Sequence, residues 1–418
     1  MAKRAVSRRE FLGAAAGCAG LLAAGIPWGG SIRSPRLLEA AGQTAPGSDA
    51  LARLVEAAPR ARYWVSAATA SSAADCAVCH APADIAGGAD HVHESREVRC
   101  LLCAQQCLIP EGERGRCRAR INVDGELRSL VYGRPISVHV DPIEKKPFYH
   151  FLPGRAAFSL ATSGCPLHCR FCQNWEISQA KPEDYRVDFV GPDRVADAAA
   201  GRDAEVIAFT YNEPTVFTEY LTDIARAGRK RGRRSVLVSC GFMTEAPLAE
   251  MCEVLDAIKI DLKGFSDGFY RDVCSAELAP VLRSIKQVAA SGTHLELVNL
   301  VVPTLNDSET MLTELAKWVM GEIGPDVPIH YTRFHPDYQL VNLPPTPIHT
   351  LERAREIAMA AGIHYAFVGN VPGHPGNHTY CPRCGAIVIE RNGFFVVAVH
   401  MKDGCCTTCG EPIRGVWS

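Results

Sequence analysis

The stretch Thr162–Trp175 reads TSGCPLHCRFCQNW, and it decides how the rest of the chain is interpreted. Its cysteines Cys165, Cys169 and Cys172 follow the spacing C-x3-C-x2-C, and no fourth cysteine follows closely. A structural metal site normally closes its shell with four ligands, whereas a site built for chemistry leaves one position open. Three thiolates on a four-iron cluster leave one iron without a protein ligand. The missing fourth thiolate therefore marks the expected reactive position.

Apolar, strand-like runs alternate with helical patterns from about residue 155 onward. The expected strands are Ala157–Ala161, Glu205–Thr210, Ser235–Ser239, Ala257–Leu262, His294–Val301 and Ile329–Phe334, with a later run at Tyr365–Val368. The expected helices are Thr215–Lys230, Pro247–Leu255, Ser284–Ala290, Glu309–Met320 and Thr350–Ala361. Six βα units predict an α/β fold with a parallel sheet, and a curled sheet of this kind is a partial (βα)6 TIM-like barrel. The cysteine triplet follows the first strand, where chemistry gathers in such folds.

The fourth expected strand carries its charges on one face. In AIKIDLK, residues 257–263, apolar residues alternate with Lys259, Asp261 and Lys263. Parallel strands are normally covered on both faces, so we expect the charged face to point into the barrel. The alternative is an ordinary solvated edge.

An open iron matters because S-adenosylmethionine (SAM) can bind it through an amine and a carboxylate. An electron from the cluster then splits the C–S bond of SAM, and the resulting 5′-deoxyadenosyl radical abstracts hydrogen. The triplet, with the aromatic Phe171 before its last cysteine, resembles the signature of the radical SAM superfamily. More narrowly, the chain resembles the radical SAM enzyme of the AmmeMemoRadiSam system, a relative of pyruvate formate-lyase activating enzymes. That resemblance runs from about residue 97 to the end, through DPIEKKPFYHFLPG (141–154), CRFCQNWEISQ (169–179), TYNEPTVFTEY (210–220), IDLKGFSDGFYRDV (260–273), YTRFHPDYQL (331–340) and CPRCG (381–385).

The resemblance implies roles for particular residues. Relatives carry a Gly-Gly-Glu-Pro-like edge that holds the SAM amino group, and here 211–214 reads YNEP, without the glycines. Phe171 would lie against the SAM adenine. Ser239, Asp261 and Lys263 would approach the ribose or the carboxylate of SAM. The implied [4Fe-4S] and SAM ligands are Cys165, Cys169, Cys172, Phe171, Asn212, Glu213, Ser239, Asp261 and Lys263.

Two further cysteine groups predict metal sites rather than disulfides, because their pairs follow C-x2-C spacing. The first comprises Cys100, Cys103, Cys107 and Cys117, and it predicts either a structural zinc or an auxiliary iron–sulfur cluster that feeds electrons to the first. The second is typical of a zinc ribbon and comprises Cys381, Cys384, Cys406 and Cys409, with Cys405 as an ambiguous neighbour. Structural zinc is favoured there, because the intervening core is too small to fold unaided.

The remaining cysteines are harder to assign among the 18 in the chain. Cys76–His80 matches the C-x2-C-H haem-attachment pattern, and the alternatives are a zinc site with His91 or His93, or a pair of unstructured thiols. Cys18 and Cys240 stand alone in the sequence. Cys252 and Cys274 are expected to be small, buried hydrophobic side chains.

The N-terminus has its own signal. Ser7–Leu12 reads SRREFL, a twin-arginine pattern followed by an uncharged Ala/Gly/Leu run to about Gly30. This resembles a Tat signal and suggests export or membrane tethering, the alternative being the cytoplasm. The run is too short and too weakly apolar to predict a permanent membrane span beyond an N-terminal tether. The net charge of −2 gives no reason to expect nucleic acid as a partner.

These patterns divide the chain into five segments. They are a signal segment (1–30), a linker or arm with the C-x2-C-H motif (31–95), a four-cysteine module (96–140), a radical SAM core barrel (141–372) and a zinc-ribbon-like module (373–418).

We expect a radical SAM enzyme, an oxidoreductase similar to pyruvate formate-lyase activating enzymes, that takes electrons from a flavodoxin- or ferredoxin-like donor. Its substrate is unknown. Similarity to activating enzymes motivates a partner protein, as in glycyl-radical activation, and the alternatives are a small molecule or a non-catalytic iron–sulfur and zinc protein for electron transfer.

Overall fold

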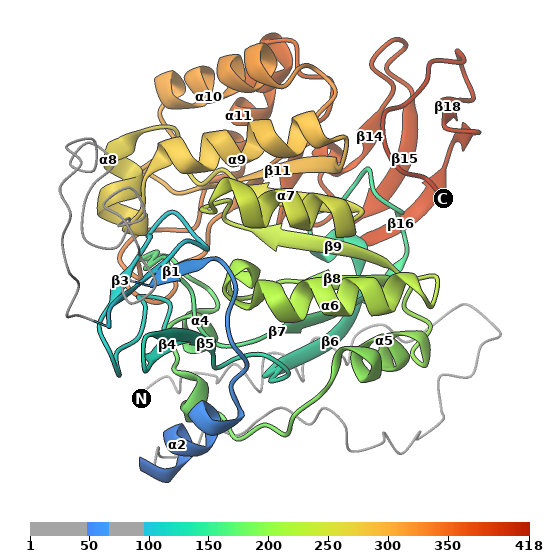
Figure 1. The fold of residues 1–418 in the computed structure, drawn as a ribbon. Coiled ribbons are helices and arrows are strands. Elements are labelled where there is room, and N and C mark those ends of the chain that lie inside the picture. The colour runs from blue at the N-terminus through green and yellow to red at the C-terminus, as the bar shows by residue number, and fades with distance from the viewer. Residues whose placement is uncertain (1–47, 67–95) are drawn as a thin grey trace, which may run out of the picture. The chain divides into compact units, whose positions relative to one another are not determined.

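A sheet of eight strands forms the centre of the protein (Figure 1). The computed structural model describes residues 48–66 and 96–418, and its central strands follow the order β13-β12-β11-β10-β9-β8-β7-β6. Neighbouring strands from β7 to β13 are parallel, and β6 pairs antiparallel with β7. The strands are β6 (Ser137–Pro142), β7 (Ala156–Ala161), β8 (Val206–Phe209), β9 (Arg234–Ser239), β10 (Ala257–Asp261), β11 (His294–Val301), β12 (Ile329–Arg333) and β13 (Ala366–Gly369).

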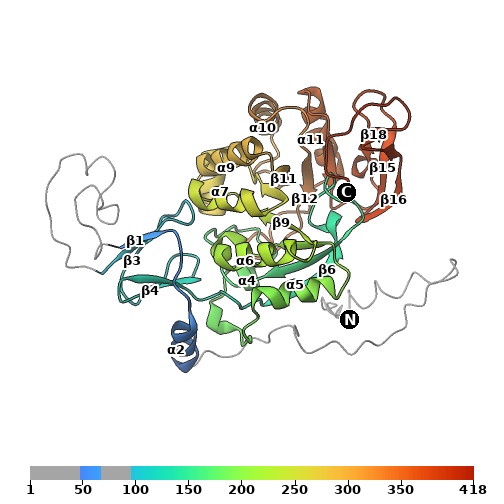
Figure 2. The same ribbon diagram turned by 45° about the vertical axis from the view of Figure 1, so that its right-hand side comes forward.

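Six helices connect the parallel strands, one in each crossover. Figures 1 and 2 show α6, α7 and α9 side by side over one side of the sheet, and α5 contacts α6. The expected (βα)6 architecture is confirmed, with β13 as a last strand. Helix α5 was not among the expected helices, because PDRVADAAA is short and rich in alanine and so shows little apolar contrast. The helices are α5 (Pro192–Ala200), α6 (Thr218–Arg229), α7 (Glu245–Val254), α9 (Leu278–Ser291), α10 (Glu309–Glu322) and α11 (Ile348–Ala360).

Short helical turns lie in the loops between these elements. The turn that ends at Cys274 is a π-helical one, a form that often occurs at functional sites. The turns are η3 (Ile143–Lys145), α4 (Trp175–Ser178), η4 (Pro182–Asp184), η5 (Pro214–Phe217), α8 (Asp267–Phe269), η6 (Tyr270–Cys274) and η7 (Pro375–Asn377).

The N-terminal module contains the first group of four cysteines. Its elements are α2 (Ser48–Ala57), β1 (Trp64–Ser66), β2 (Val98–Cys100), β3 (Leu108–Ile109), β4 (Arg120–Val123) and β5 (Glu126–Ser129). The expectation of a loose arm over 31–95 is wrong for residues 48–66. Leu54 and Ala58 of α2 pack on Ile121 and Leu130, and β1 pairs with β2. Composition hid this helix, because its small apolar face is buried only against a distant hairpin.

A buried ion pair fastens this module to the barrel. Arg120 on β4 is fully buried, and its Nη2 donates to both carboxylate oxygens of Glu219 on α6, at 2.6 and 2.7 Å. A third hydrogen bond runs from the backbone N–H of Arg62 to the same carboxylate, at 2.8 Å. Removing one partner of such a pair leaves an uncompensated buried charge, so the module has a fixed attachment to α6.

The C-terminal module is a set of short antiparallel strands that shares its core with the barrel. Tyr149, Tyr365 and Phe367 pack against the ribbon residues Val388 and Ile413. This shared core agrees with the expectation that the module is too small to fold alone. Its strands are β14 (Thr379–Tyr380), β15 (Ile387–Asn392), β16 (Phe395–Val399), β17 (Met401–Lys402) and β18 (Cys405–Cys406).

Several expectations fall outside the described residues. The twin-arginine pattern, Cys18 and the Cys76–His80 motif with His91 and His93 all lie there. None of the helices within 48–66 and 96–418 has both the length and the hydropathy that spanning a lipid bilayer requires.

Candidate functional site

A cavity of about 390 Å³ opens inside the curve of the sheet, at the carboxyl ends of the parallel strands. Residues from the ends of β8 to β12 line it, together with the loop that follows β7. The sequence motif and the strand ends therefore meet where the topology predicts. All nine residues expected to bind the cluster and SAM line this one cavity: Cys165, Cys169, Phe171, Cys172, Asn212, Glu213, Ser239, Asp261 and Lys263.

The triplet is held in a compact loop between β7 and α4. The N–H of Cys172 donates to the carbonyl of Cys169 at 3.1 Å, and the N–H of Gly164 donates to the carbonyl of Ile177 at 2.9 Å. Gly164 has a φ of 96°, and a Cβ at this position would lie 2.3 Å from the carbonyl oxygen of Cys117. Only glycine fits such a conformation and such a close approach. These contacts give the loop a defined backbone conformation.

Two thiols that the motif does not include lie beside the triplet. Cys274, at the end of the π-helical turn, is fully buried and hydrogen-bonds to Cys169. This bond lowers the pKa of Cys169, although burial opposes the shift. Cys240, which follows β9, lines the same cavity, and burial together with the nearby Glu213 and Cys165 raises the pKa of its thiol. Cys274 is buried, as expected, and its thiol also contacts an expected cluster ligand, which its lone place in the sequence did not indicate.

The charged face of β10 points into the cavity, as predicted. Asp261 lies between two lysines: Lys259 Nζ donates to one of its oxygens, and Lys263 Nζ donates to the other at 3.1 Å. Burial alone would raise the pKa of Asp261, but the two ammonium groups lower it to about 2. Lys263 Nζ also lies 5.7 Å from the centre of the Phe171 ring. The wall beside the triplet therefore carries a net positive charge, which suits an anionic group on a bound ligand.

Glu213 organises the ends of β8 and β9. Its carboxylate accepts from Thr215 N and Oγ1 at 3.2 and 2.6 Å, from Ser239 Oγ at 2.7 Å and from Cys240 N at 2.7 Å. Four donors fill about as many acceptor positions as a carboxylate has. Glu213 therefore fixes the shape of this wall, and its direct contact with SAM stays a prediction.

Sequence reasoning missed a polar group at the edge of the sheet. Lys146 Nζ donates to Asp141 at 2.7 Å, Tyr211 Oη donates to the same carboxylate at 2.8 Å, and Lys146 lies 4.2 Å from the centre of the Tyr211 ring. Burial lowers the pKa of Lys146 to about 8, against the effect of Asp141. Lys146 and Tyr211 line the cavity. The stretch DPIEKKPFYHFLPG (141–154) could have indicated this group, because it contains Asp141 and Lys146, but neither residue was assigned to the site from the sequence.

Tyr211 adopts a φ of 72°, which is uncommon for a residue with a Cβ. It stands where the Gly-Gly-Glu-Pro-like edge of relatives carries glycine. The bond from its hydroxyl to Asp141 holds the ring in place.

We expect Glu213→Gln to weaken SAM binding by about 10-fold or more. A glutamine turns one acceptor oxygen into a donor that faces the Ser239 hydroxyl or the Cys240 amide, and leaving a buried donor unsatisfied costs about 1–3 kcal/mol. Anaerobic calorimetry on the cluster-loaded protein measures the SAM dissociation constant. Ser239→Ala is the control, since it removes one donor and keeps the charge, and we expect a loss of about fivefold. Unchanged affinity in Glu213→Gln would remove this residue from the site.

A model of the radical SAM superfamily matches residues 159–316, which include the triplet and strands β8 to β11 of the cavity wall. An uncharacterized protein of Methanocaldococcus jannaschii is 42% identical over 322 residues, which are 77% of this chain and 96% of that protein. The chain belongs to the radical SAM superfamily.

Two solved structures of radical SAM type are similar to the chain. One is a domain of a pyruvate-formate lyase-activating enzyme from Bacteroides vulgatus, with 16% identity, a TM-score of 0.36 and coverage of 39% of this chain and 98% of that chain. Another is a radical SAM methyltransferase from Sphaerobacter thermophilus, with 15% identity, a TM-score of 0.42 and coverage of 52% and 67%.

Membership of the radical SAM superfamily implies a [4Fe-4S] cluster and SAM, and the residues present fit both. The thiols of Cys165, Cys169 and Cys172 line one cavity, and three thiolates from the motif would leave one iron of a four-iron cluster for another ligand. Asn212, which donates to the carbonyl of Gly164 at 2.9 Å, has a buried Oδ1 with no protein partner. A buried acceptor without a donor is costly, and the ammonium or a hydroxyl of SAM would satisfy it.

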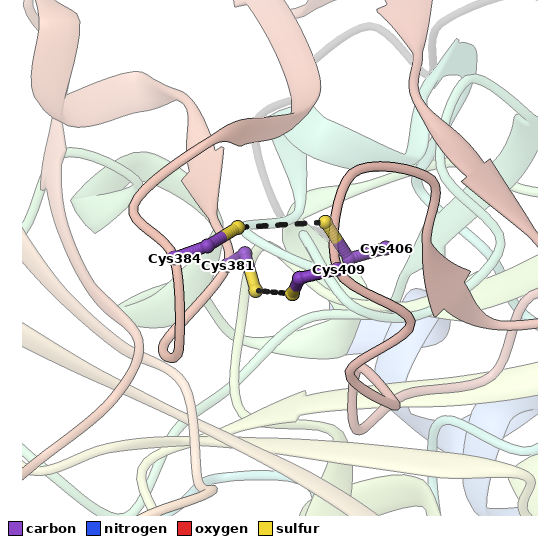
Figure 3. Close-up of side chains that lie close together, drawn as sticks. All are labelled: Cys381, Cys384, Cys406 and Cys409. Atoms are coloured by element: carbon purple, nitrogen blue, oxygen red, sulfur yellow. Dashed lines mark hydrogen bonds between the residues drawn. The ribbon is translucent and has the colours of Figure 1, made fainter.

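The four C-terminal cysteines converge as predicted, on two facing loops (Figure 3). The sulfurs of Cys381 and Cys409 are 3.6 Å apart, and those of Cys384 and Cys406 are 3.8 Å apart. A tetrahedral zinc with Zn–S bonds of about 2.3 Å requires separations of about 3.8 Å. Cys405 lies outside the set, and its thiol donates to the carbonyl of Asp403.

Proposed function

We propose that this radical SAM enzyme abstracts a hydrogen atom from a partner protein and leaves a radical on it. The observation that carries the proposal is the single cavity that joins the three cluster thiols to the residues expected to hold SAM. Cys165, Cys169 and Cys172 would hold the cluster, which when bound and reduced would supply the electron that splits SAM into methionine and a 5′-deoxyadenosyl radical. That radical would take a hydrogen atom from the substrate and become 5′-deoxyadenosine.

The residues that line the cavity would bind SAM, orient it and shield it from water. Lys263 and Lys259 provide positive charge for a carboxylate, and Asn212 provides an acceptor for an ammonium or hydroxyl group. Phe171 offers an aromatic face for the adenine, with Phe269 stacked behind it at 6.2 Å between ring centres. Since these side chains are buried or half-buried, they limit the access of water, which protects a reactive radical.

A protein substrate is favoured by the size of the cavity and by sequence. A volume of about 390 Å³ is near the lower end of the range for sites that hold one drug-sized ligand, so SAM itself would take most of it. The substrate must then approach from the mouth, which suits an exposed protein segment. The stretches that resemble AmmeMemoRadiSam radical SAM enzymes and activating enzymes support the same substrate class. The electron would come from a flavodoxin- or ferredoxin-like donor.

The test follows hydrogen from the substrate into the product. An extract of source cells grown in D2O is separated by ultrafiltration into a macromolecular fraction and a filtrate. Each fraction is mixed, under anaerobic conditions, with SAM and the reduced, cluster-loaded enzyme. We expect deuterium in 5′-deoxyadenosine with the macromolecular fraction, lost after that fraction is digested with protease. Mass spectrometry measures the label, and enzyme without the triplet is the blank.

Deuterium that appears only with the filtrate would overturn the protein substrate in favour of a small molecule. No 5′-deoxyadenosine with either fraction, from enzyme with a full cluster, would overturn the radical function and return attention to electron transfer without catalysis.

A further inference from the structure

The N-terminal module gathers its four cysteines in one place. Cys100 ends β2 and Cys107 precedes β3, and the N–H of Cys100 donates to the carbonyl of Cys107 at 3.0 Å. Cys103 lies in the turn between them, and Cys117 comes from the loop before β4. The thiol of Cys103 is within electrostatic reach of the other three. Cys100, Cys103 and Cys117 are buried, so the group faces the interior of the module.

Each of the four sulfurs accepts a hydrogen bond from a backbone amide. Arg116 N lies 3.4 Å from Cys107 Sγ, and the amides that serve Cys100, Cys103 and Cys117 are those of Leu102, Gln105 and Ala119. Hydrogen bonds to the sulfurs of metal-binding cysteines orient these ligands and tune a bound cluster. Four sulfurs gathered in one place, each beside a backbone amide, form the ligand set that one metal ion or one cluster requires.

The spacing of the sulfurs separates a single ion from a cluster. Among the residues that the structure describes, one group of potential metal ligands has all its ligand atoms within 4.8 Å of one another. This group is the C-terminal set of Cys381, Cys384, Cys406 and Cys409. The N-terminal set and the radical SAM triplet are both wider than that. A zinc ion brings its four sulfurs within about 3.8 Å, whereas a multi-iron cluster is larger and holds them further apart. The N-terminal set therefore resembles the triplet and not the ribbon.

The module is packed directly on the loop of the first cluster. The carbonyl oxygen of Cys117 lies 2.3 Å from where a Cβ of Gly164 would be, and Cys165 is the next residue. Arg118 donates to Gln179 Oε1 at 3.1 Å and lies 3.2 Å from His168 Nε2, both in the segment that surrounds the triplet. The two cysteine groups are thus neighbours in space.

We propose that Cys100, Cys103, Cys107 and Cys117 bind a second iron–sulfur cluster that exchanges electrons with the first. The proposal of a second cluster depends only on the contacts given above. The proposal that this cluster supplies electrons for SAM cleavage rests on the proposed function. A flavodoxin- or ferredoxin-like carrier gives one electron to the second cluster, which is reoxidised as it reduces the first. No proton is transferred and no bond is formed or broken in this step.

The test removes the first cluster and asks what remains. The Cys165→Ser/Cys169→Ser/Cys172→Ser variant and the wild type are reconstituted with iron and sulfide, and iron and zinc are quantified. We expect the variant to keep about half of the wild-type iron and to give the EPR signal of a reduced iron–sulfur cluster with dithionite. A variant that binds no iron, with or without zinc at the module, would overturn the proposal. Because the readout is iron and EPR, failure of SAM cleavage leaves it unaffected.

Electron exchange requires closeness, and EPR reports it directly. Cys107→Ser changes the least buried ligand and so keeps the fold, and its reduced spectrum gives the first cluster without an intact second one. We expect the reduced wild type to show broadening from spin–spin coupling that the sum of the two variant spectra lacks. A wild-type spectrum equal to that sum would overturn the exchange between the clusters.

Discussion

Replacing Cys169 by alanine is expected to reduce the formation of 5′-deoxyadenosine by more than about 100-fold. Cys169 is 8% exposed, lines the cavity and lies centrally in the triplet, and alanine offers the iron no ligand atom in its place. Loss of residues that only support metal ligands already costs 10–100-fold, and loss of a ligand itself exceeds that. The measurements are 5′-deoxyadenosine by mass spectrometry and iron bound per chain, both under anaerobic conditions.

Two other cysteines make matched controls. Cys274→Ala removes the thiol that hydrogen-bonds Cys169, and we expect an intermediate loss of about 10-fold, since such bonds orient a ligand and tune the cluster. Cys252→Ala alters a half-buried thiol outside the cavity, and we expect activity close to that of the wild type. If Cys169→Ala kept more than a tenth of the activity, the triplet would not be the cluster site.

The architecture was predictable because each strand carries its own signal. Strand β8 reads VIAF and is buried on both faces, as a run without alternation indicates for a parallel strand. In β10 the alternation of Lys259 and Asp261 with isoleucines showed which face meets the cavity. The triplet could be placed because strand order fixes where the loop after the first strand must lie. Local pattern and topology therefore sufficed for the fold and for the main wall of the site.

The rest of the site depends on contacts that spacing does not encode. Cys240 and Cys274 follow different strands, and only folding brings their thiols to Cys165 and Cys169. The Lys146–Asp141–Tyr211 group forms across the antiparallel edge of the sheet, which the predicted βα pattern did not contain. Side chains that meet through such long-range packing leave no periodic trace in the sequence.

Removing the metal from the C-terminal set is expected to unfold the ribbon and to destabilise the barrel with it. Zinc held by four thiolates contributes an apparent binding free energy of about 10–16 kcal/mol, and in small modules this energy is folding energy. The double variant Cys384→Ser/Cys409→Ser should therefore carry no zinc at this site, while the wild type carries about one equivalent there. Limited proteolysis should cut the variant within 381–418 and spare the wild type.

The barrel loses stability because the ribbon supplies a buried charge. Arg391 on β15 is fully buried, donates to the carbonyl of Tyr149 at 2.6 Å and lies 3.8 Å from the carboxylate of Glu144. An unfolded ribbon leaves Glu144 buried without its partner, which costs about 3–5 kcal/mol and lowers the melting temperature by roughly 10 °C. Cys405→Ser is the control, because Cys405 adjoins the set without belonging to it, and we expect its zinc content and melting temperature to match the wild type. If Cys405→Ser and the double variant changed zinc content and melting temperature equally, the four thiols would not form a metal site. Packing alone would then join the ribbon to the segment that carries Glu144, Lys146 and Tyr149.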